Sequence, residues 1–201
     1  FFTDVQAKGE YPYYVKRFFR DYGVDIKMED GDLETLKAGV VDYISISYYM
    51  TYIMRYKGKI SPEPSGKLLT EIKNQYLEMT EWGWPIDPVG FRITLNHIYD
   101  RYHLPIFIAE NGNGMTENRD ENGYCDDDAH IEYMKEHVEQ MHQAILDGVD
   151  VFGYAWWGPI DLISSGTSEM TKRYGQISVD QDDHGNGTGK RGKKKSFFYY
   201  K

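Results

Sequence analysis

Three apolar runs alternate with amphipathic segments along this chain, and their order predicts the architecture. The runs cover residues 40–49, 104–110 and 149–157 and are rich in β-branched and aromatic residues, which is typical of buried strands. Between them, residues 89–102 and 127–148 carry apolar residues three or four positions apart, which predicts two helices. Further helices are expected over residues 10–23, in a short segment beginning at Gly31, and after Ser196.

The two long helical segments each have an apolar stripe that we expect to face the core. In the first segment the stripe consists of Phe91, Leu95, Ile98 and Tyr102, with a neighbouring stripe of Val89, Ile93 and His97. In the second segment, which Asp127 or Asp128 is expected to cap, the stripe consists of Ile131, Met134, Val138, Met141 and Ile145. Loops are predicted at residues 59–66, 81–88, 115–126 and 160–175, and a short extended piece at 176–180.

Strand and helix in regular alternation indicate an α/β fold with a parallel sheet. Three strands cannot close a barrel of eight, which usually takes about 250 residues. A doubly wound open sheet is the alternative, but no glycine-rich phosphate fingerprint follows the first strand. We therefore expect the C-terminal half of a (β/α)₈ TIM barrel, with residues 1–201 forming a single partial domain. The function of such a partial barrel would depend on residues outside this sequence.

Charge and cysteine content narrow the classes of partner and compartment. The net charge of −9 argues against nucleic acid as a partner, and the basic cluster at residues 190–195 is interpreted as a solvated loop. No apolar run has membrane-spanning length, so no membrane partner is expected. A single cysteine, Cys125, suits a reducing compartment, and we expect a cytoplasmic protein. The chain begins without Met, so its lack of a signal peptide carries no information.

The second apolar run ends on a carboxylate, Glu110, followed by Asn111 and two glycines within three residues. At the carboxyl edge of a parallel barrel, where chemistry is located, this glutamate is a candidate nucleophile. An ordinary glutamate in a turn is an equally good interpretation of this stretch alone. Residues 47–49 and 156–157 end the two other strands with tyrosines and tryptophans. A carboxylate among such rings suits a retaining glycosidase, in which the carboxylate attacks the sugar and aromatic faces stack on it.

Several motifs, in order, resemble family-one glycoside hydrolases, the β-glucosidase and 6-phospho-β-glucosidase group. Residues 107–112 (Phe-Ile-Ala-Glu-Asn-Gly) resemble the nucleophile motif of the family. Residues 42–50, 82–88 and 150–157 resemble its sixth strand, the loop before its seventh strand, and its eighth strand. The resemblance implies that Glu110 is the nucleophile, that Tyr49 donates a hydrogen bond to it, and that Trp157 lines the sugar subsite. Core packing is the alternative role for Tyr49 and Trp157.

The loop after the last strand indicates the subgroup. Ser164 and Ser165 stand where the resemblance places a Glu and a Trp in members that act on neutral glucosides, and a carboxylate there would repel a phosphate. Residues 172–175, Lys-Arg-Tyr-Gly, resemble the segment whose Lys and Tyr bind the 6-phosphate. Lys172, Tyr174 and the two serines are therefore expected to bind phosphate, unless Lys172 and Arg173 are simply solvated. The resemblance also implies glucosides rather than galactosides, because Ser165 and Gly166 are small where the galactoside subgroup has a bulky Trp.

The acid/base glutamate of the family, in its N-E-P motif, has no counterpart in these 201 residues. Glu63 lies between two prolines in the loop predicted at residues 59–66, so we do not assign it that role. We expect a fragment of a 6-phospho-β-glucosidase that is inactive without the N-terminal half of the barrel, takes a phosphorylated β-glucoside, and uses no cofactor or metal. The alternatives are a fragment of a neutral β-glucosidase and a non-catalytic carbohydrate-binding half-barrel. His130 and Asn113 depart from the family pattern.

Overall fold

A three-stranded parallel sheet forms the centre of the computed structural model, which describes residues 1–53, 74–117, 120 and 125–201. Its strands are β1 (Ile44–Tyr48), β2 (Ile106–Asn111) and β3 (Val151–Trp156), in that order across the sheet. The three predicted strands are thus confirmed, although β1 is shorter than expected. The loop predicted at residues 59–66, with Glu63, lies outside the described residues.

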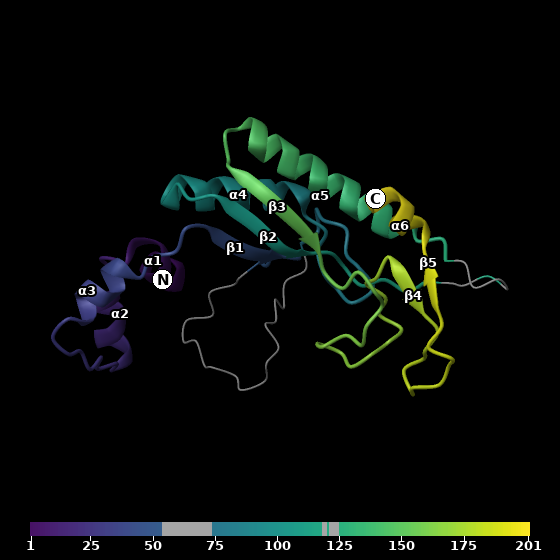
Figure 1. Ribbon diagram of the computed structural model, residues 1–201, viewed down its shortest axis with the longest axis horizontal. Helices are drawn as coiled ribbons and strands as arrows, with labels where there is room; N and C mark the ends of the chain where they lie inside the picture. The colour runs from purple at the N-terminus through teal and green to yellow at the C-terminus, as the bar shows by residue number, and fades with distance from the viewer. Residues whose placement is uncertain (54–73, 118–119, 121–124) are drawn as a thin grey trace.

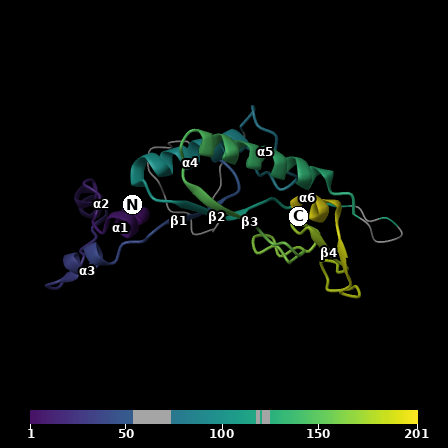
Figure 2. The ribbon, with the colours of Figure 1, turned by 45° about the horizontal axis from the view of Figure 1, so that its top comes forward.

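Two helices connect these strands and lie on the same face of the sheet (Figures 1 and 2). Helix α4 (Pro88–Tyr102) connects β1 to β2, and α5 (Asp128–Leu146) connects β2 to β3. The core lies between this helical layer and the sheet, where Phe91 and Leu95 of α4 and Ile106 and Ile108 of β2 are fully buried. Val89 and Ile93 are exposed, so the stripe predicted through Phe91 and Leu95 is the buried one.

The stripe predicted for α5 is confirmed only in part. Met134 is buried and Met141 packs against the core, but Val138 and Ile145 are exposed. The buried residues of this helix are His130, Tyr133, Met134, His137 and Ala144. The imidazole of His137 stacks on the ring of Tyr133, with centroids 3.9 Å apart, and its Nδ1 lies 2.8 Å from the carbonyl oxygen of Tyr133. Burial lowers the pKa of His137 to about 4, so it behaves as a neutral core residue.

The N-terminal segment forms three short helices at the end of the sheet where the strands begin (Figure 1). They are α1 (Phe2–Lys8), which was not predicted, α2 (Val15–Tyr22) and α3 (Asp32–Ala38). The helix expected over residues 10–23 begins later than predicted, because Pro12 lies in the turn before it and accepts a hydrogen bond from the amide of Val15. Of the residues in α2, Val15 is buried, while Phe18 and Tyr22 are exposed.

The C-terminal segment lies at the opposite end of the sheet, beside the carboxyl ends of the strands (Figure 1). Strand β4 (Ile177–Val179) pairs antiparallel with β5 (Arg191–Lys193), and helix α6 (Lys195–Tyr200) follows. The extended piece at residues 176–180 and the last helix are confirmed. The basic cluster at residues 190–195 is not a solvated loop as interpreted, because it contains β5 and its Lys194 is fully buried in ion pairs.

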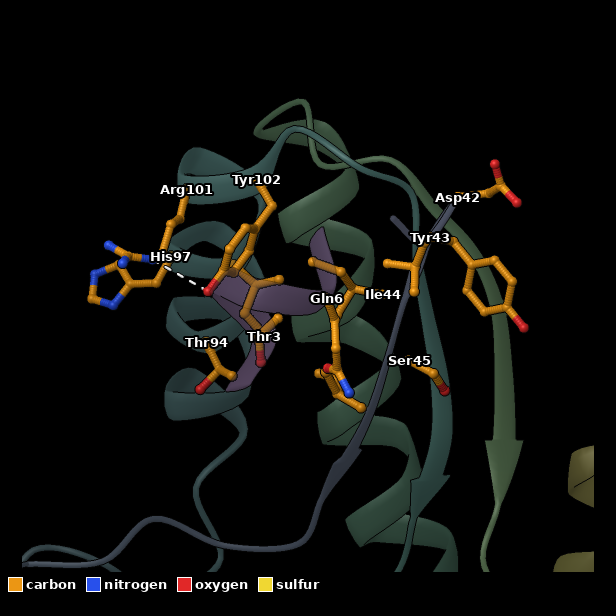
Figure 3. A pocket seen from close by; sticks show the side chains of 13 residues that line it. Thr3, Gln6, Asp42, Tyr43, Ile44, Ser45, Thr94, His97, Arg101 and Tyr102 are labelled. Carbon is orange, nitrogen blue, oxygen red and sulfur yellow. Dashed lines mark hydrogen bonds between the residues drawn. The ribbon is translucent and has the colours of Figure 1, made fainter. Parts of the chain in front are cut away.

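A cavity of about 760 Å³ lies between α1, β1 and α4 (Figure 3). Thr3 and Gln6 enter it from α1, Ser45 from β1, and Thr94 and His97 from α4. Its lining contains none of the predicted site residues. Among the described residues, no helix is long and apolar enough to cross a membrane.

The packing of α4 leads to a direct test. Replacing Leu95 with Ala removes a fully buried side chain and leaves a cavity, so we expect the free energy of unfolding to fall by about 2–5 kcal/mol. Ile93→Ala is the control on the same helix, at a side chain that is 50% exposed, and should cost less than about 1 kcal/mol. Urea denaturation measures both values. Equal losses would contradict the assigned buried face.

Candidate active site at the carboxyl ends of the strands

A break in strand register places Glu110 at the carboxyl end of β2. Ile46 of β1 pairs with Ile108, whereas the next residue, Ser47, pairs with Glu110, so Ala109 is an extra residue in β2. Such bulges change the direction of the side chains that follow them. The side chain of Asn111 reaches Tyr133 on the helical face of the sheet, so the neighbouring Glu110 is directed away from the helices.

Tyr49, directly after β1, donates a hydrogen bond from its hydroxyl group to Oε2 of Glu110 at 2.7 Å. Burial raises the pKa of Tyr49, and the neighbouring Glu110 carboxylate raises it further. The phenol therefore stays protonated and remains a donor. The structure brings together the two residues that the sequence singled out as nucleophile and partner.

Asn111 fixes the backbone around this pair. It is fully buried, and its amide nitrogen donates to the carbonyl oxygen of Tyr48 at 2.8 Å and to the hydroxyl oxygen of Tyr133 at 3.2 Å. Its Oδ1 accepts a hydrogen bond from the hydroxyl group of Tyr154 at 2.8 Å. One side chain thus joins β1, β2, β3 and α5 at the level of Glu110, which holds the strand ends in a fixed relation.

Lys172 is almost completely buried in a cage of aromatic rings. Its ammonium nitrogen lies 4.0 Å from the ring centroid of Trp84, 5.2 Å from that of Trp82 and 5.6 Å from that of Tyr174. Burial lowers the pKa of Lys172, and the carboxylate of Glu169 acts in the opposite direction. The alternative of a solvated Lys172–Arg173 pair is wrong, because Arg173 binds Asp161 and the carbonyl oxygens of Val179 and Gln181.

Ser164 and Tyr174 lie beside each other, with their hydroxyl oxygens 3.4 Å apart, and both residues are buried. Ser165 is exposed. Gly114, four residues after Glu110, lies against Lys172: a Cβ atom on Gly114 would stand 2.4 Å from Cγ of Lys172. A glycine is needed there because the Lys172 side chain crosses its backbone.

Trp84 connects the two groups of predicted site residues. Its ring centroid lies 5.6 Å from that of Tyr49 and 6.5 Å from that of Tyr174. The loop at residues 81–88 carries Trp82 and Trp84, and the structure places both rings against Lys172. Trp157 is half-buried, and its amide donates to the carbonyl oxygen of Asn111 at 2.9 Å, so its backbone lies at the same strand ends.

Two carboxylates that sequence reasoning did not assign to the site hold the segment around Lys172. Oδ1 of Asp161 accepts from the amide of Gly175 at 2.9 Å and from the ammonium of Lys194 at 2.8 Å. Oδ1 of Asp183 accepts from the amides of Met170 and Thr171, both at 2.6 Å. Asp161 lies four residues after Trp157, in the segment that follows the predicted third strand, whereas nothing in the sequence pattern indicated Asp183.

Glu117, Asp127 and His130 form a buried group with the residue types of a metal site. Nδ1 of His130 lies 3.1 Å from Oε1 of Glu117 and 3.7 Å from Oδ2 of Asp127. The Lys194 ammonium lies 2.6 Å from Oε2 of Glu117 and already supplies a positive charge there. Asp127 occupies the N-cap position of α5 as expected, but its carboxylate accepts hydrogen bonds from the amide and hydroxyl of Ser196 and makes no capping hydrogen bond. We read the group as an ion-pair network that joins α5 to the C-terminal segment.

The fold and the site define a class: part of a parallel α/β barrel with a hydrogen-bonded carboxylate at the carboxyl end of one strand. The model of glycosyl hydrolase family 1 matches residues 1–201, and the chain belongs to this family. The predicted fold, the C-terminal half of a (β/α)₈ barrel, is confirmed by the solved structures it resembles. The family 1 β-glucosidase from Thermotoga maritima has a TM-score of 0.77 and 27% identity, covering 99% of this chain and 41% of that one.

Curated relatives with phospho-glucosidase names are more similar in sequence. The aryl-phospho-beta-D-glucosidase BglH of Bacillus subtilis (strain 168) is 50% identical over 200 residues, covering all of this chain and 43% of the relative. The 6-phospho-beta-glucosidase AscB of Escherichia coli (strain K12) is 47% identical over 201 residues, with 42% of its length covered. A 6-phospho-beta-galactosidase of Clostridium acetobutylicum is 31% identical. The chain spans less than half the length of these relatives.

The ion-pair network predicts a pH dependence of stability. Burial alone would lower the pKa of His130, but the carboxylates of Asp127 and Glu117 outweigh it and raise the pKa above 6.5. Because the pKa of His130 is higher in the folded than in the unfolded chain, its protonation stabilises the fold. This stabilisation is complete below pH 6.5 and is lost as the pH rises through the folded-state pKa. We expect the free energy of unfolding to fall as the pH rises from 6.5 through the raised pKa of His130. The fall should be smaller in the His130→Gln variant. His142→Gln, an exposed position on the same helix, should keep the slope. Denaturation curves measured between pH 6 and 9 give the slope for the unsubstituted chain and for each variant.

Proposed function

We propose that this chain is the C-terminal part of a retaining glycosidase that hydrolyses 6-phospho-β-glucosides to glucose 6-phosphate and an aglycone. The observation that carries the proposal is the caged, buried ammonium of Lys172, joined through Trp84 to the Tyr49–Glu110 pair. One ring thus stands between a nucleophile and a cation suited to phosphate. The phospho-β-glucosidase names of the relatives with 46–50% identity support the same substrate class.

In the proposed reaction, the Glu110 carboxylate attacks the anomeric carbon and forms a covalent glycosyl-enzyme, which water then hydrolyses. Tyr49 donates a hydrogen bond to the carboxylate and orients it. Trp157 lines the sugar subsite. A second carboxylate must protonate the leaving oxygen and later deprotonate the water, and retaining enzymes hold it about 5–5.5 Å from the nucleophile. Since no N-E-P motif occurs in this sequence, we propose that the N-terminal half of the barrel supplies this group and that the chain alone is inactive.

The 6-phosphate is assigned to Lys172, Tyr174 and Ser164, with Ser165 at the exposed rim. A phosphate accepts charge-assisted hydrogen bonds from an ammonium and ordinary ones from hydroxyl groups. Among the described residues, Lys172 takes part in no ion pair and the Glu169 carboxylate acts on it only through space, so a phosphate would provide a direct counter-charge. Ser165 and Gly166 are small, which favours glucosides over galactosides. Cys125 suits a reducing compartment, and we place the enzyme in the cytoplasm.

The open face of the sheet supports a partner that completes the barrel. The helices cover one face of the sheet (Figure 1). On the other face the ring of Phe152 packs against those of Tyr43 and Phe107. Tyr43 is 49% exposed and Phe152 is 56% exposed, which is unusual for adjacent large rings on a sheet. In a closed barrel this face is the packed interior. The N-terminal half of the barrel, the partner that we propose, would bury it.

The subgroup assignment is tested with the assembled enzyme on paired chromogenic β-glucosides, with and without a 6-phosphate. Lys172→Ala removes a charge-assisted interaction of about 1.5–3 kcal/mol, so KM for the phosphorylated substrate should rise about 10- to 100-fold. KM for the neutral substrate should change little. Equal effects on both substrates, or a preference of the unsubstituted enzyme for the neutral one, would favour the β-glucosidase function that the Thermotoga maritima structures carry by name.

The role of Tyr49 is tested in the same assay. Tyr49→Phe removes one hydrogen bond to a charged carboxylate while keeping the ring against Trp84. A loss of about 1.5–3 kcal/mol predicts a kcat that is about 10- to 100-fold lower with a nearly unchanged KM. Tyr174→Phe is the matched tyrosine change at the phosphate end and should act on KM instead. A Tyr49→Phe enzyme with unchanged kcat would remove Tyr49 from the catalytic site.

A further inference from the structure

Glu169 has no part in the proposed chemistry, yet it contacts the cage around Lys172. Its Oε2 accepts a hydrogen bond from Nε1 of Trp82 at 2.9 Å, across 87 positions of sequence. The Trp82 ring is one of those that face the Lys172 ammonium. This bond therefore joins the loop at residues 81–88 to the loop that carries the phosphate-binding residues.

The backbone of Glu169 also closes the turn that begins at Ser164. The amide of Ser164 donates to the carbonyl oxygen of Glu169 at 2.9 Å, and the amide of Ser168 donates to the carbonyl oxygen of Ser164 at 2.8 Å. Ser168 has a φ of 60°, a left-handed conformation that a serine seldom adopts. The turn is thus held in a strained form with Glu169 at its end, and Glu169 contacts both Ser164 and Trp82.

The side chain of Glu169 has two effects on a bound anion, and they oppose each other. Its hydrogen bond keeps the indole of Trp82 in place over Lys172. The carboxylate is hydrogen-bonded to Trp82, whose ring centroid lies 5.2 Å from the Lys172 ammonium, so its negative charge would also repel a phosphate dianion bound at Lys172. Glutamine can accept the same hydrogen bond without the charge, whereas alanine has neither. The two effects are therefore separable by substitution.

We propose that Glu169 is a positioning residue of the phosphate site, which holds Trp82 over Lys172 through its hydrogen bond and limits the affinity for anions through its charge. The proposal rests on the assignment of Lys172 to phosphate in the proposed function. It adds a determinant of affinity that is separate from the groups that touch the phosphate.

Glucose 6-phosphate is the probe, and its binding to the assembled enzyme, in which this chain is joined to the N-terminal half of the barrel, is measured by titration calorimetry. Glu169→Gln and Glu169→Ala both lack the charge, so the ratio of their Kd values measures the hydrogen bond alone. We expect Glu169→Ala to bind about 10-fold more weakly than Glu169→Gln. We expect Glu169→Gln to bind more tightly than the unsubstituted chain. In a Trp82→Phe background, which lacks the indole donor, the ratio should fall to about one.

A ratio that persists in the Trp82→Phe background would overturn the proposal, as would a ratio near one in the unsubstituted background. Glu81→Gln is the matched control, because Glu81 precedes Trp82 and its carboxylate binds the amide and hydroxyl of Thr116 instead. Its Kd should stay within about twofold of that of the unsubstituted chain.

Lys172→Met separates this inference from the proposed function. If Lys172→Met and the unsubstituted chain bind glucose 6-phosphate equally, or neither binds it, the assignment of the phosphate site fails, and this inference fails with it. Suppose that Lys172→Met loses binding while the unsubstituted chain keeps it, and that Glu169→Ala and Glu169→Gln have nearly equal Kd values. The assignment of the phosphate site then stands, and only the role of Glu169 fails.

Discussion

The buried ion pair between Lys194 and Asp161 is the interaction on which the arrangement of the site depends. Both side chains are fully buried, and the ammonium also lies 2.6 Å from Oε2 of Glu117. Three segments meet there: the loop after β2, the segment after β3, and the turn between β5 and α6. A buried charge without its partner costs several kcal/mol. None of these segments can therefore move away independently. Asp161 also accepts a hydrogen bond from the amide of Gly175, which fixes the backbone next to Tyr174.

Lys194 and Lys172 are two buried lysines whose charges are balanced in different ways. Lys194 has two carboxylates within 3 Å, so its charge is neutralised inside the chain. Lys172 faces the rings of Trp82, Trp84 and Tyr174, which attract a cation through their π-electrons but carry no charge. The pKa of Lys172 is accordingly lowered by burial. Lys194 thus has direct counter-charges within the chain, whereas Lys172 has no ion pair among the described residues, as the proposed phosphate site requires.

The elements of the sheet and its helices were predictable from apolar spacing, whereas the buried face of α5 was predictable only in part, through Met134 and Met141. Its buried stripe contains His130 and His137, which hydropathy counts as polar although one ion-pairs with carboxylates and the other stacks on Tyr133. The pair of Glu110 and Tyr49 was predictable because parallel strands end at one edge. The contacts of Asp183, Gly114 and Lys194 were not, because each joins segments whose spatial proximity appears only after the loops are folded.

The bulge at Ala109 shows how one backbone irregularity determines which groups face the site. Strict alternation would place Glu110 on the same face as Ile106 and Ile108, which are buried under the helices. A lone carboxylate there would be desolvated at a large cost. With one extra residue, Asn111 takes the helical face instead and has partners for both polar atoms of its amide. Glu110 is thereby directed to the open face, where the hydroxyl of Tyr49 meets it. Asn111, whose polar atoms all find partners, is buried, and Glu110, the proposed nucleophile, remains partly accessible.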